Sequence, residues 1–436
     1  MLSLQFIREN TERVRRDMLL RNADVNIDRI LQLDEQRRAL LQQVEGLRAK
    51  RNAASKAIGA SKDPAEREAR IAEMRLVGDE IERLEGKLRT VEEELQQRLY
   101  EVPNIVDEAV PRGPDETSNV VVETVGEPRE FDFVPRPHWE LGVIVDGLDI
   151  ERGARMSGSR FYILKGPLAR LQRALIQFML DEHVAAGFTE AYVPYMLSEA
   201  SLLASGQLPK FRDNLYRDAE EDFYFIPTAE VALVNYHRDE IIPPGQLPQR
   251  FVAHTPCFRR EKMSAGRDVR GIKRGHQFEK VEMFVYCEPE ASTAEFDLLV
   301  SRAKHIAAAL ELPHRVVALC SGDLGFNAAR TFDLEVWAPG QAEWLEVSSA
   351  SNCLDFQARR ANIRYRPAPD APLRHPHMLN ASGLALPRTV IAVMENYQQA
   401  DGSIVVPPPL RRYMGADVIP AVAPPPPQRD LSLIHI

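Results

Sequence analysis

The chain has 436 residues, of which 44% are hydrophobic, so we expect two or three domains with sizeable cores. Its formal net charge of −9 excludes an overall basic surface, and any contact with nucleic acid must therefore use local patches. Four widely spaced cysteines without a Cys-x-x-Cys pair argue against a disulfide framework or a cysteine-rich zinc site, and fit a reducing cytosol.

The first residues lack the charged and apolar regions of a signal peptide, and no apolar run in the chain approaches the length of a membrane-spanning helix. We therefore expect a cytoplasmic protein that has no membrane segment.

Residues 27–100 differ from the rest because apolar residues recur there at spacings of three and four. The two heptad runs are separated by an Asp63-Pro64 turn signal, which predicts an antiparallel coiled-coil hairpin with arms of about 45 Å or more. The first run becomes basic towards the turn, at Arg48, Lys50, Arg51 and Lys56. A long arm with a basic flank can follow an RNA through phosphate contacts. The alternative interpretation is a dimerisation coiled coil or a solvated spacer.

Beyond this helical arm (residues 1–102), the proline-rich stretch 103–139 is interpreted as a linker. Short apolar strands and helices then alternate through residues 140–415, which predicts an α+β domain with an antiparallel sheet flanked by helices. The expected strands are 191–194, 223–226, 251–254, 281–286, 315–319, 332–337 and 344–349, and the expected helices are 168–183, 292–310 and 388–397. No phosphate-binding loop of the Gly-x-x-x-x-Gly-Lys type is present, so a nucleotide would be held by side chains on the sheet. Residues 416–436 form a Pro-rich tail whose last six residues, 431–436, we interpret as non-native.

The segment 255–282 carries the strongest chemical signal in the chain. It places Arg259, Glu261, Phe278 and Glu282 on two short strands that are joined by a charged loop. A guanidinium group can grip a phosphate and a carboxylate, and an aromatic face can stack on a base. A buried carboxylate can hold an ammonium group or a hydroxyl. Together these groups predict a site that joins a nucleotide to a small amino acid.

With these motifs the chain, over residues 1 to about 415, resembles the bacterial-type seryl-tRNA synthetases, a family of class II aminoacyl-tRNA synthetases. The hairpin resembles their tRNA-binding arm. Residues 168–194 resemble motif 1, which forms the dimer interface in this family. Residues 255–282 resemble motif 2, and residues 383–398 resemble motif 3. The chain departs from the family pattern at Lys262-Met263 in the motif 2 loop and at Gly275 beside the ATP pocket.

The resemblance implies an ATP site with two catalytic arginines. Arg259 is expected to bridge the α-phosphate and the amino-acid carboxylate, and Arg388 to clamp the γ-phosphate. A cation at the start of a helix is unfavourable for the helix dipole, which itself suggests a bound anion near Arg388. Oxygen ligands suit Mg²⁺, and Glu346 and Ser349 are its expected ligands. The implied ATP-binding set is Arg259, Arg260, Glu261, Gly275, Phe278, Glu346, Val347, Ser348, Ser349 and Arg388, with Phe278 stacked on adenine and Glu261 at its amino group.

The resemblance also implies a serine pocket made of Thr228, Ala229, Glu230, Arg259, Glu282 and Ser382. A site built to hydrogen-bond a hydroxyl rejects the analogue that lacks it by about 10⁴–10⁵, so alanine should be excluded. Threonine keeps the hydroxyl, and steric closure must reject it. Either carboxylate can hold the ammonium group, and we favour Glu282 with Ser382 for the hydroxyl.

The function implied is that of a serine–tRNA ligase. Such an enzyme activates L-serine with ATP to seryl-adenylate and transfers serine to the 3′ end of tRNA(Ser), and of tRNA(Sec) where the organism has one. The resemblance also implies a homodimer, and no zinc is expected because the chain lacks a His/Cys cluster with ligand spacing. One rival is a carrier-protein aminoacyl ligase, which typically lacks the arm. The other is an inactive RNA-binding paralogue, which would have lost Arg259, Arg388 or the serine carboxylates.

Overall fold

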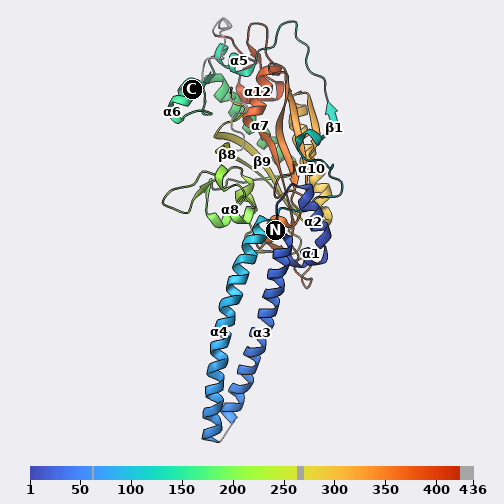
Figure 1. Ribbon diagram of the computed structural model, residues 1–436. Coiled ribbons are helices and arrows are strands. Elements are labelled where there is room, and N and C mark those ends of the chain that lie inside the picture. The colour runs from blue at the N-terminus through green and yellow to red at the C-terminus, as the bar shows by residue number, and fades with distance from the viewer. Residues whose placement is uncertain (61–62, 263–269, 423–436) are drawn as a thin grey trace. The chain divides into compact units, whose positions relative to one another are not determined.

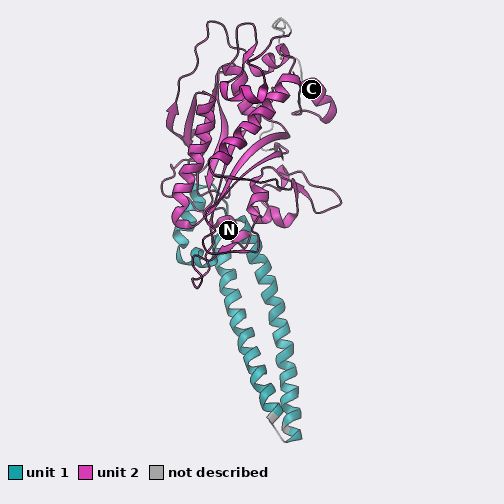
Figure 2. Ribbon diagram, turned by 180° about the vertical axis from the view of Figure 1, so that it is seen from behind, with its two compact units in different colours: residues 1–103 teal, residues 104–436 magenta. Residues whose placement is uncertain are grey.

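The computed structural model describes residues 1–60, 63–262 and 270–422 (Figure 1). The chain divides into two compact units, Met1–Pro103 and Asn104–Ile436 (Figure 2). Met263, residues 267–269 of motif 2 and the tail from residue 423 onwards, including residues 431–436, lie outside the described residues.

The first unit contains the predicted helical hairpin, which is confirmed. Two short helices, α1 (Leu4–Glu9) and α2 (Thr11–Leu20), precede the long helices α3 (Ile27–Ala60) and α4 (Pro64–Glu101). The heptad residues form the seam between the long helices, where the following side chains are 1–4% exposed: Leu33, Val44, Ile81, Leu84 and Leu95. This buried seam is what holds two helices together that would otherwise be marginal in water.

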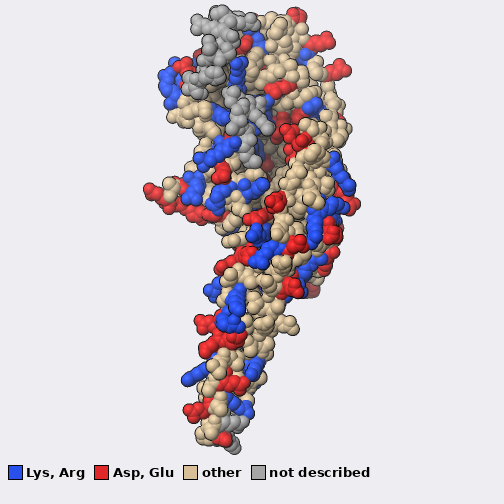
Figure 3. All heavy atoms as spheres, viewed as in Figure 1, with Lys and Arg blue, Asp and Glu red and all other residues tan. Residues whose placement is uncertain are grey.

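Ion pairs between the two long helices and a cap at the start of α4 also stabilise the hairpin. The ion pairs Arg29–Glu94 at 2.6 Å and Arg37–Glu92 at 2.9 Å join α3 to α4. Asp63 accepts a hydrogen bond from the Ala65 N–H at 2.9 Å and Pro64 occupies the first turn, so the Asp-Pro signal starts α4. On the face shown in Figure 3, acidic and basic side chains are interspersed along this unit.

The second unit is built on an eight-stranded sheet in the order β1-β10-β11-β12-β14-β9-β8-β4. All of its described strand pairs are antiparallel except β4 with β8, which confirms the predicted sheet type. Its strands are β1 (Val120–Val125), β4 (Thr189–Glu190), β8 (Gln249–Phe258), β9 (Gln277–Cys287), β10 (His314–Ala318), β11 (Arg330–Ala338), β12 (Glu343–Asn352) and β14 (His377–Ala385). Strands β8 and β9 are longer than predicted, and the central strand β14 was not predicted.

Alternation along the strands gives the sheet two different faces. Val281, Met283 and Val285 of β9 point into a large core with α7 (Gly166–Ala185), α10 (Ser292–Ala309) and α12 (Leu386–Asn396). Phe284 and Tyr286, on the other face, belong to a second core with α9 (Glu230–Val234) and α11 (Phe356–Arg360).

The remaining helices are α5 (His138–Ile144), α6 (Ile150–Ser157), α8 (Glu199–Ser205) and α13 (Arg411–Met414). Four small two-stranded sheets pair β2 (Leu148–Asp149) with β3 (Ile163–Leu164), β5 (Met196–Leu197) with β6 (Tyr224–Phe225), β7 (Ile241–Ile242) with β13 (Arg364–Tyr365), and β15 (Ile404–Val405) with β16 (Val418–Ile419).

The structure differs from the sequence-based expectations at two connections and at one strand. The stretch 103–139, interpreted as a linker, supplies the edge strand β1, whose residues Val120–Val122 are about half exposed, so backbone pairing rather than burial holds it. The segment from residue 416, interpreted as tail, contributes β16, where Ile419 is buried. The strand expected at 191–194 lies instead at β4, and Tyr192 is 88% exposed. Among the described helices, none combines the length and apolar character needed to cross a bilayer.

Candidate active site

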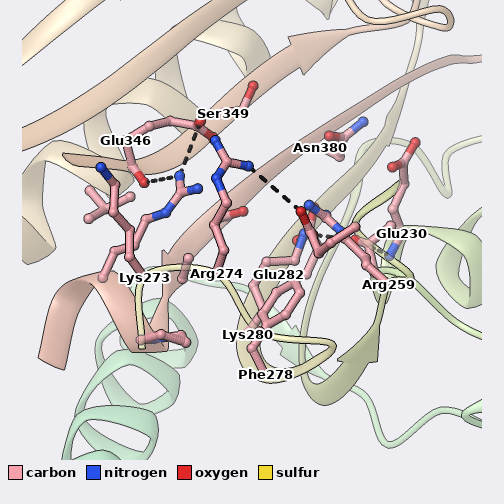
Figure 4. A pocket seen from close by; sticks show the side chains of 18 of the residues that line it. Glu230, Arg259, Lys273, Arg274, Phe278, Lys280, Glu282, Glu346, Ser349 and Asn380 are labelled. Carbon is pink, nitrogen blue, oxygen red and sulfur yellow. Dashed lines mark hydrogen bonds and ion pairs between the residues drawn. The ribbon is translucent and has the colours of Figure 1, made fainter. Parts of the chain in front are cut away.

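A cavity of about 330 Å³ lies on the face of the sheet opposite α7 and α10, and the first turn of α12 also borders it (Figure 4). The predicted site residues that line it are Thr228, Glu230, Arg259, Glu261, Gly275, Phe278, Glu282, Glu346, Val347, Ser349, Ser382 and Arg388. A volume of this size is typical of pockets for small ligands and cofactors.

Strand alternation explains how two neighbouring strands supply this cavity. The even-numbered residues Phe278, Lys280 and Glu282 of β9 face it, while the odd-numbered residues Val281 and Met283 face the large core. Strand β14 follows the same rule, because Asn380 and Ser382 line the cavity and Leu379 and Ala381 are in the core. The register Ser382↔Glu282 places these two polar side chains opposite each other on one face.

A β-bulge brings the polar residues of β12 to the same cavity. Leu334 of β11 pairs with Ser348 but Glu335 pairs with Glu346, so Val347 is an extra residue on β12. Without the bulge, Glu346 and Ser349 would point to opposite faces, because three positions separate them. With it, both side chains line the cavity together with Ser351.

The carboxylate end of the cavity is a buried, charge-coupled cluster. The Lys280 ammonium group forms an ion pair with Glu282 and donates a hydrogen bond to Thr228 Oγ1 at 2.8 Å. Lys280 is 7% and Glu282 is 1% exposed, so this pair is largely removed from water. Glu230 accepts a hydrogen bond from Gln357 Nε2 at 2.6 Å. Burial, and then the negative charge of Glu282, raise the pKa of the Glu230 carboxyl to about 7.

Arg259 follows the last residue of β8 directly. The backbone hydrogen bonding between β8 and β9 continues to this residue, one position beyond the end of β8. Its N–H donates to the His276 carbonyl at 2.9 Å, and its carbonyl lies 3.0 Å from His276 Nδ1. Its Nε donates to the Pro227 carbonyl at 3.3 Å. The guanidinium carbon lies 5.1 Å from the centroid of the Phe278 ring. These contacts fix the guanidinium group at the edge of the carboxylate cluster, where Figure 4 shows it near Glu230.

Arg388 lies in the first turn of α12, two residues after the helix begins. Its Nη1 donates to the Glu346 backbone carbonyl at 2.6 Å and pairs with the Glu346 carboxylate at 3.1 Å. Lys273 and Arg274 lie near Glu346 and Ser349 in Figure 4, so cations gather at this end of the cavity. Two ends of different character therefore share one cavity, one with buried carboxylates and one with several cations.

Gly275 lines the cavity at a point where neighbouring atoms approach its backbone closely. A Cβ atom there would lie 3.1 Å from the Gln277 carbonyl, 3.2 Å from the Arg160 carbonyl and 3.3 Å from the Tyr162 ring. A larger residue at position 275 would therefore crowd these three neighbours. The glycine that departs from the family pattern fits the local packing of this chain.

Three residues of the expected site do not line the cavity. Ala229 is buried at the start of α9. Arg260 is exposed, and its guanidinium carbon lies 5.9 Å from the Tyr216 ring centroid. The Ser348 hydroxyl donates to the Ser382 carbonyl at 2.6 Å, so it supports the strand that carries Ser382.

The cavity also contains residues that sequence reasoning missed. They are Gln207, Lys273, Arg274, Lys280, Ser351 and Asn380. Lys280 stands two positions before Glu282, so strand alternation could have found it. Asn380 could not have been found without a prediction of β14, and no local signal marks Gln207.

No group of three or more His, Cys, Asp or Glu side chains that could hold a metal ion occurs within residues 1–60, 63–262 and 270–422. Mg²⁺ differs from zinc in this respect, because it usually binds through one or two carboxylates together with substrate phosphates. Glu346, whose side chain is 47% exposed, and Ser349 share the cavity face beside the cations. This donor set fits a magnesium ion that is held jointly with a polyphosphate.

The antiparallel sheet, the Arg-bearing hairpin β8–β9 and the Arg at the start of α12 are the features of a class II aminoacyl-tRNA synthetase core. Residues 211–397 match the model described as "tRNA synthetase class II core domain (G, H, P, S and T)", and residues 1–106 match "Seryl-tRNA synthetase N-terminal domain". The chain is 58% identical to "Serine--tRNA ligase" of Roseiflexus sp. over 95% of its own length and 98% of that protein. It is 56% identical to the enzyme of the same name from Dehalococcoides mccartyi, over 96% of this chain and 100% of that one.

A solved structure agrees with these relatives. The seryl-tRNA synthetase of Pyrococcus horikoshii, complexed with ATP, matches with a TM-score of 0.91 and 37% identity, over 97% of this chain and 100% of that chain. The chain belongs to the seryl-tRNA synthetase family.

Proposed function

We propose that this chain activates L-serine with ATP and then transfers the serine to the 3′-terminal adenosine of tRNA(Ser). The observation that carries the proposal is the position of Arg259 in one cavity with a buried carboxylate cluster and a cluster of cations. The carboxylates suit the ammonium and hydroxyl groups of serine, and the cations suit the phosphates of ATP. The activity of the relatives and the complex of the Pyrococcus horikoshii enzyme with ATP support it.

In the first step, a serine carboxylate oxygen attacks the α-phosphorus of ATP, and the bond to the bridging oxygen breaks to release pyrophosphate. Both reactants are anionic there, so Arg259 would offset their repulsion and stabilise the charge of the transition state. Phe278 would stack on the adenine, with Glu261 at its amino group, and Arg388 would hold the γ-phosphate. Mg²⁺ held by Glu346 and Ser349 would supply further charge neutralisation at the phosphates.

Within the serine pocket the contacts favour a division of roles between the two carboxylates. Glu282 is already paired with Lys280, which makes it and the facing Ser382 suited to the serine hydroxyl. Within the described residues the Glu230 carboxylate forms no ion pair with an ammonium group and accepts a hydrogen bond from the Gln357 amide, so it is suited to the serine ammonium group. A cation would favour the ionised form of its carboxyl.

A pH dependence follows from the raised pKa of Glu230. Only the ionised carboxylate can pair with the ammonium group, so the KM for serine should rise as the pH falls below about 7, the pKa of Glu230. We expect the Glu230→Gln variant to have a high KM for serine that changes little across this range. Rates of serine-dependent ATP–pyrophosphate exchange at several pH values give the KM for serine of both the unaltered protein and the variant. A KM for serine that is flat across pH 7 in the unaltered protein would contradict this role.

The four basic residues predicted to bind tRNA fall into two pairs, which differ in whether acidic residues of the hairpin neutralise their charges. Arg48 and Lys50 form ion pairs with Glu85 and Glu73 of α4, each at 2.7 Å. Arg51 and Lys56 are exposed and have no ion pair within the described residues. We therefore propose that Arg51 and Lys56 make the phosphate contacts.

Replacing both Arg51 and Lys56 with alanine should raise the KM for tRNA(Ser) and reduce the slope of its salt dependence by about 1 per residue. The matched control is the double alanine variant of Arg48 and Lys50, where acidic partners already hold the charges, and its effect should be smaller. Serine-dependent exchange without tRNA should be unchanged in both. Equal effects of the two double variants on the tRNA step would count against this assignment.

We further propose a cytoplasmic homodimer. Large apolar side chains are exposed along the motif 1 segment at Val184 (43%) and Tyr192 (88%), and just beyond it at Met196 (51%). Exposed apolar side chains of this kind are typical of surfaces that associate with a partner. Recognition of tRNA by shape would also admit tRNA(Sec) where the organism has one.

The test of the proposed function is ATP–pyrophosphate exchange with serine, alanine and threonine. Exchange with serine alone supports activation, and transfer to tRNA(Ser) completes the assignment. A folded protein that exchanges with none of them would instead be the inactive RNA-binding paralogue. Charging of a carrier protein in place of tRNA would indicate the carrier-protein ligase.

A further inference from the structure

A buried hydrogen-bonded network connects α12 to the segment 271–275 without lining the cavity. Its centre is the carboxylate of Glu395, which is fully buried. This carboxylate accepts hydrogen bonds from the His138 backbone N–H at 2.9 Å, the Gly340 N–H at 2.9 Å and the Gln341 side chain at 2.9 Å. The ring atom Nδ1 of His138, also fully buried, lies 3.1 Å from the same carboxylate.

These contacts define the tautomer of His138. A carboxylate that receives several N–H donors is an acceptor, so Nδ1 carries the proton and donates to Glu395. The lone pair on Nε2 is then free to accept, and the Ile272 backbone N–H donates to it at 3.1 Å. Gly271 has a φ of +73°, and a Cβ atom there would lie 1.9 Å from Nε2, so glycine is needed for this approach.

The backbone held by His138 leads directly into the cavity wall. Ile272 is 1% exposed, and the next three residues, Lys273, Arg274 and Gly275, all line the cavity. At the other end of the network, Glu395 lies in α12, whose first turn carries Arg388. The imidazole therefore joins two segments that both present cations to the same end of the cavity.

We propose that His138 is a positioning residue for ATP, whose neutral imidazole fixes the Ile272 backbone relative to α12 and thereby places Lys273 and Arg274. This inference rests on the proposed function, in which that end of the cavity binds the phosphates. None of the hydrogen bonds of this network described above involves Glu230 or Glu282 at the serine end. A defect in the network should therefore affect ATP more than serine.

Two substitutions of His138 distinguish the two hydrogen bonds of its imidazole, because each keeps one bond and removes the other. In His138→Gln the amide oxygen can take the place of Nε2 and accept from Ile272, whereas the bond to Glu395 is lost. In His138→Asn the amide nitrogen can take the place of Nδ1 and donate to Glu395, whereas the buried Ile272 N–H loses its acceptor. We expect His138→Asn to raise the KM for ATP in the exchange reaction by about tenfold, with the KM for serine nearly unchanged. His138→Gln should keep a KM for ATP close to that of the unaltered protein.

Gln341→Ala is the matched control, because it removes another donor to Glu395 and leaves Ile272 untouched, and its KM for ATP should be unaltered. Equal KM values for ATP in the Asn and Gln variants, or a parallel rise for serine, would overturn the proposal. Loss of the folded state in His138→Asn, seen by circular dichroism at the assay temperature, would also overturn it, because the imidazole would then be a structural element. Absence of exchange in the unaltered protein would refute the proposed function, and this inference with it.

Discussion

Replacing Arg259 with alanine is expected to lower kcat for serine-dependent ATP–pyrophosphate exchange by about 10²–10³, because a preorganised cation at the reacting phosphate would be lost. The effect should fall on kcat more than on either KM, since the charge that Arg259 offsets is greatest in the transition state. Arg259→Lys keeps the charge but loses the planar fork, so an intermediate loss is expected. Steady-state exchange kinetics measure each of these constants.

Arg260 offers the matched control for this prediction. It is the next residue and carries the same charge, but it is exposed and does not line the cavity. Arg260→Ala should therefore keep exchange close to the original rate. If both alanine variants lost activity equally, a general effect of positive charge on this strand end would replace the specific role of Arg259.

Replacing Glu282 with alanine is expected to have two separate effects. Serine should lose the partner of its hydroxyl, and the buried Lys280 ammonium group would be left without its carboxylate. Breaking a buried pair by removing one partner lowers the free energy of unfolding by about 3–5 kcal/mol. We expect exchange with serine to be lost, and chemical denaturation to show this loss of stability.

A double variant distinguishes the folding effect from the binding effect. Changing Lys280 and Glu282 together to methionine removes both charges, and such replacements are often neutral or stabilising. Its stability should recover while exchange with serine stays absent. Glu279→Gln, on the opposite face of β9 where Glu279 contacts His254 at 2.8 Å, is the control and should keep exchange. Recovery of exchange in the double variant would show that Glu282 contributes only to folding.

Several features of the fold were predictable from the sequence alone. The hairpin was predictable because the heptad period and the Asp63-Pro64 cap are local signals, read within a few turns of helix. The strands β8 to β12 were also found because their apolar runs are continuous, although β8, β9, β11 and β12 were predicted shorter than observed and β10 was displaced by one residue. Strand β14 was missed, since its Asn380, Ser382 and Gly383 lower its apolar character where it borders the cavity.

The candidate site was foreseen in its motif residues but not in its internal contacts. Arg259, Glu282 and Arg388 were identified from their motifs, and the structure brings them into one cavity. The pairing of Lys280 with Glu282 and Thr228 was not identified, and the proposed division of roles between the two carboxylates depends on it. Arg260 was included because it is next in sequence, whereas in the structure it lies beyond the end of β8, is exposed and does not line the cavity.

The residue types and their order in the chain thus sufficed to predict the family and the fold class and to propose the reactive groups, because each depends on a short run of sequence. The bulge at Val347, which puts Glu346 and Ser349 on one face, depends on the register between two strands. The bonds from His138 to Glu395 and to Ile272 join residues 257 and 134 positions apart. Contacts of this kind arise only when the sheet and α12 have packed, because burial and strand register, rather than local propensity, bring the groups within hydrogen-bonding distance.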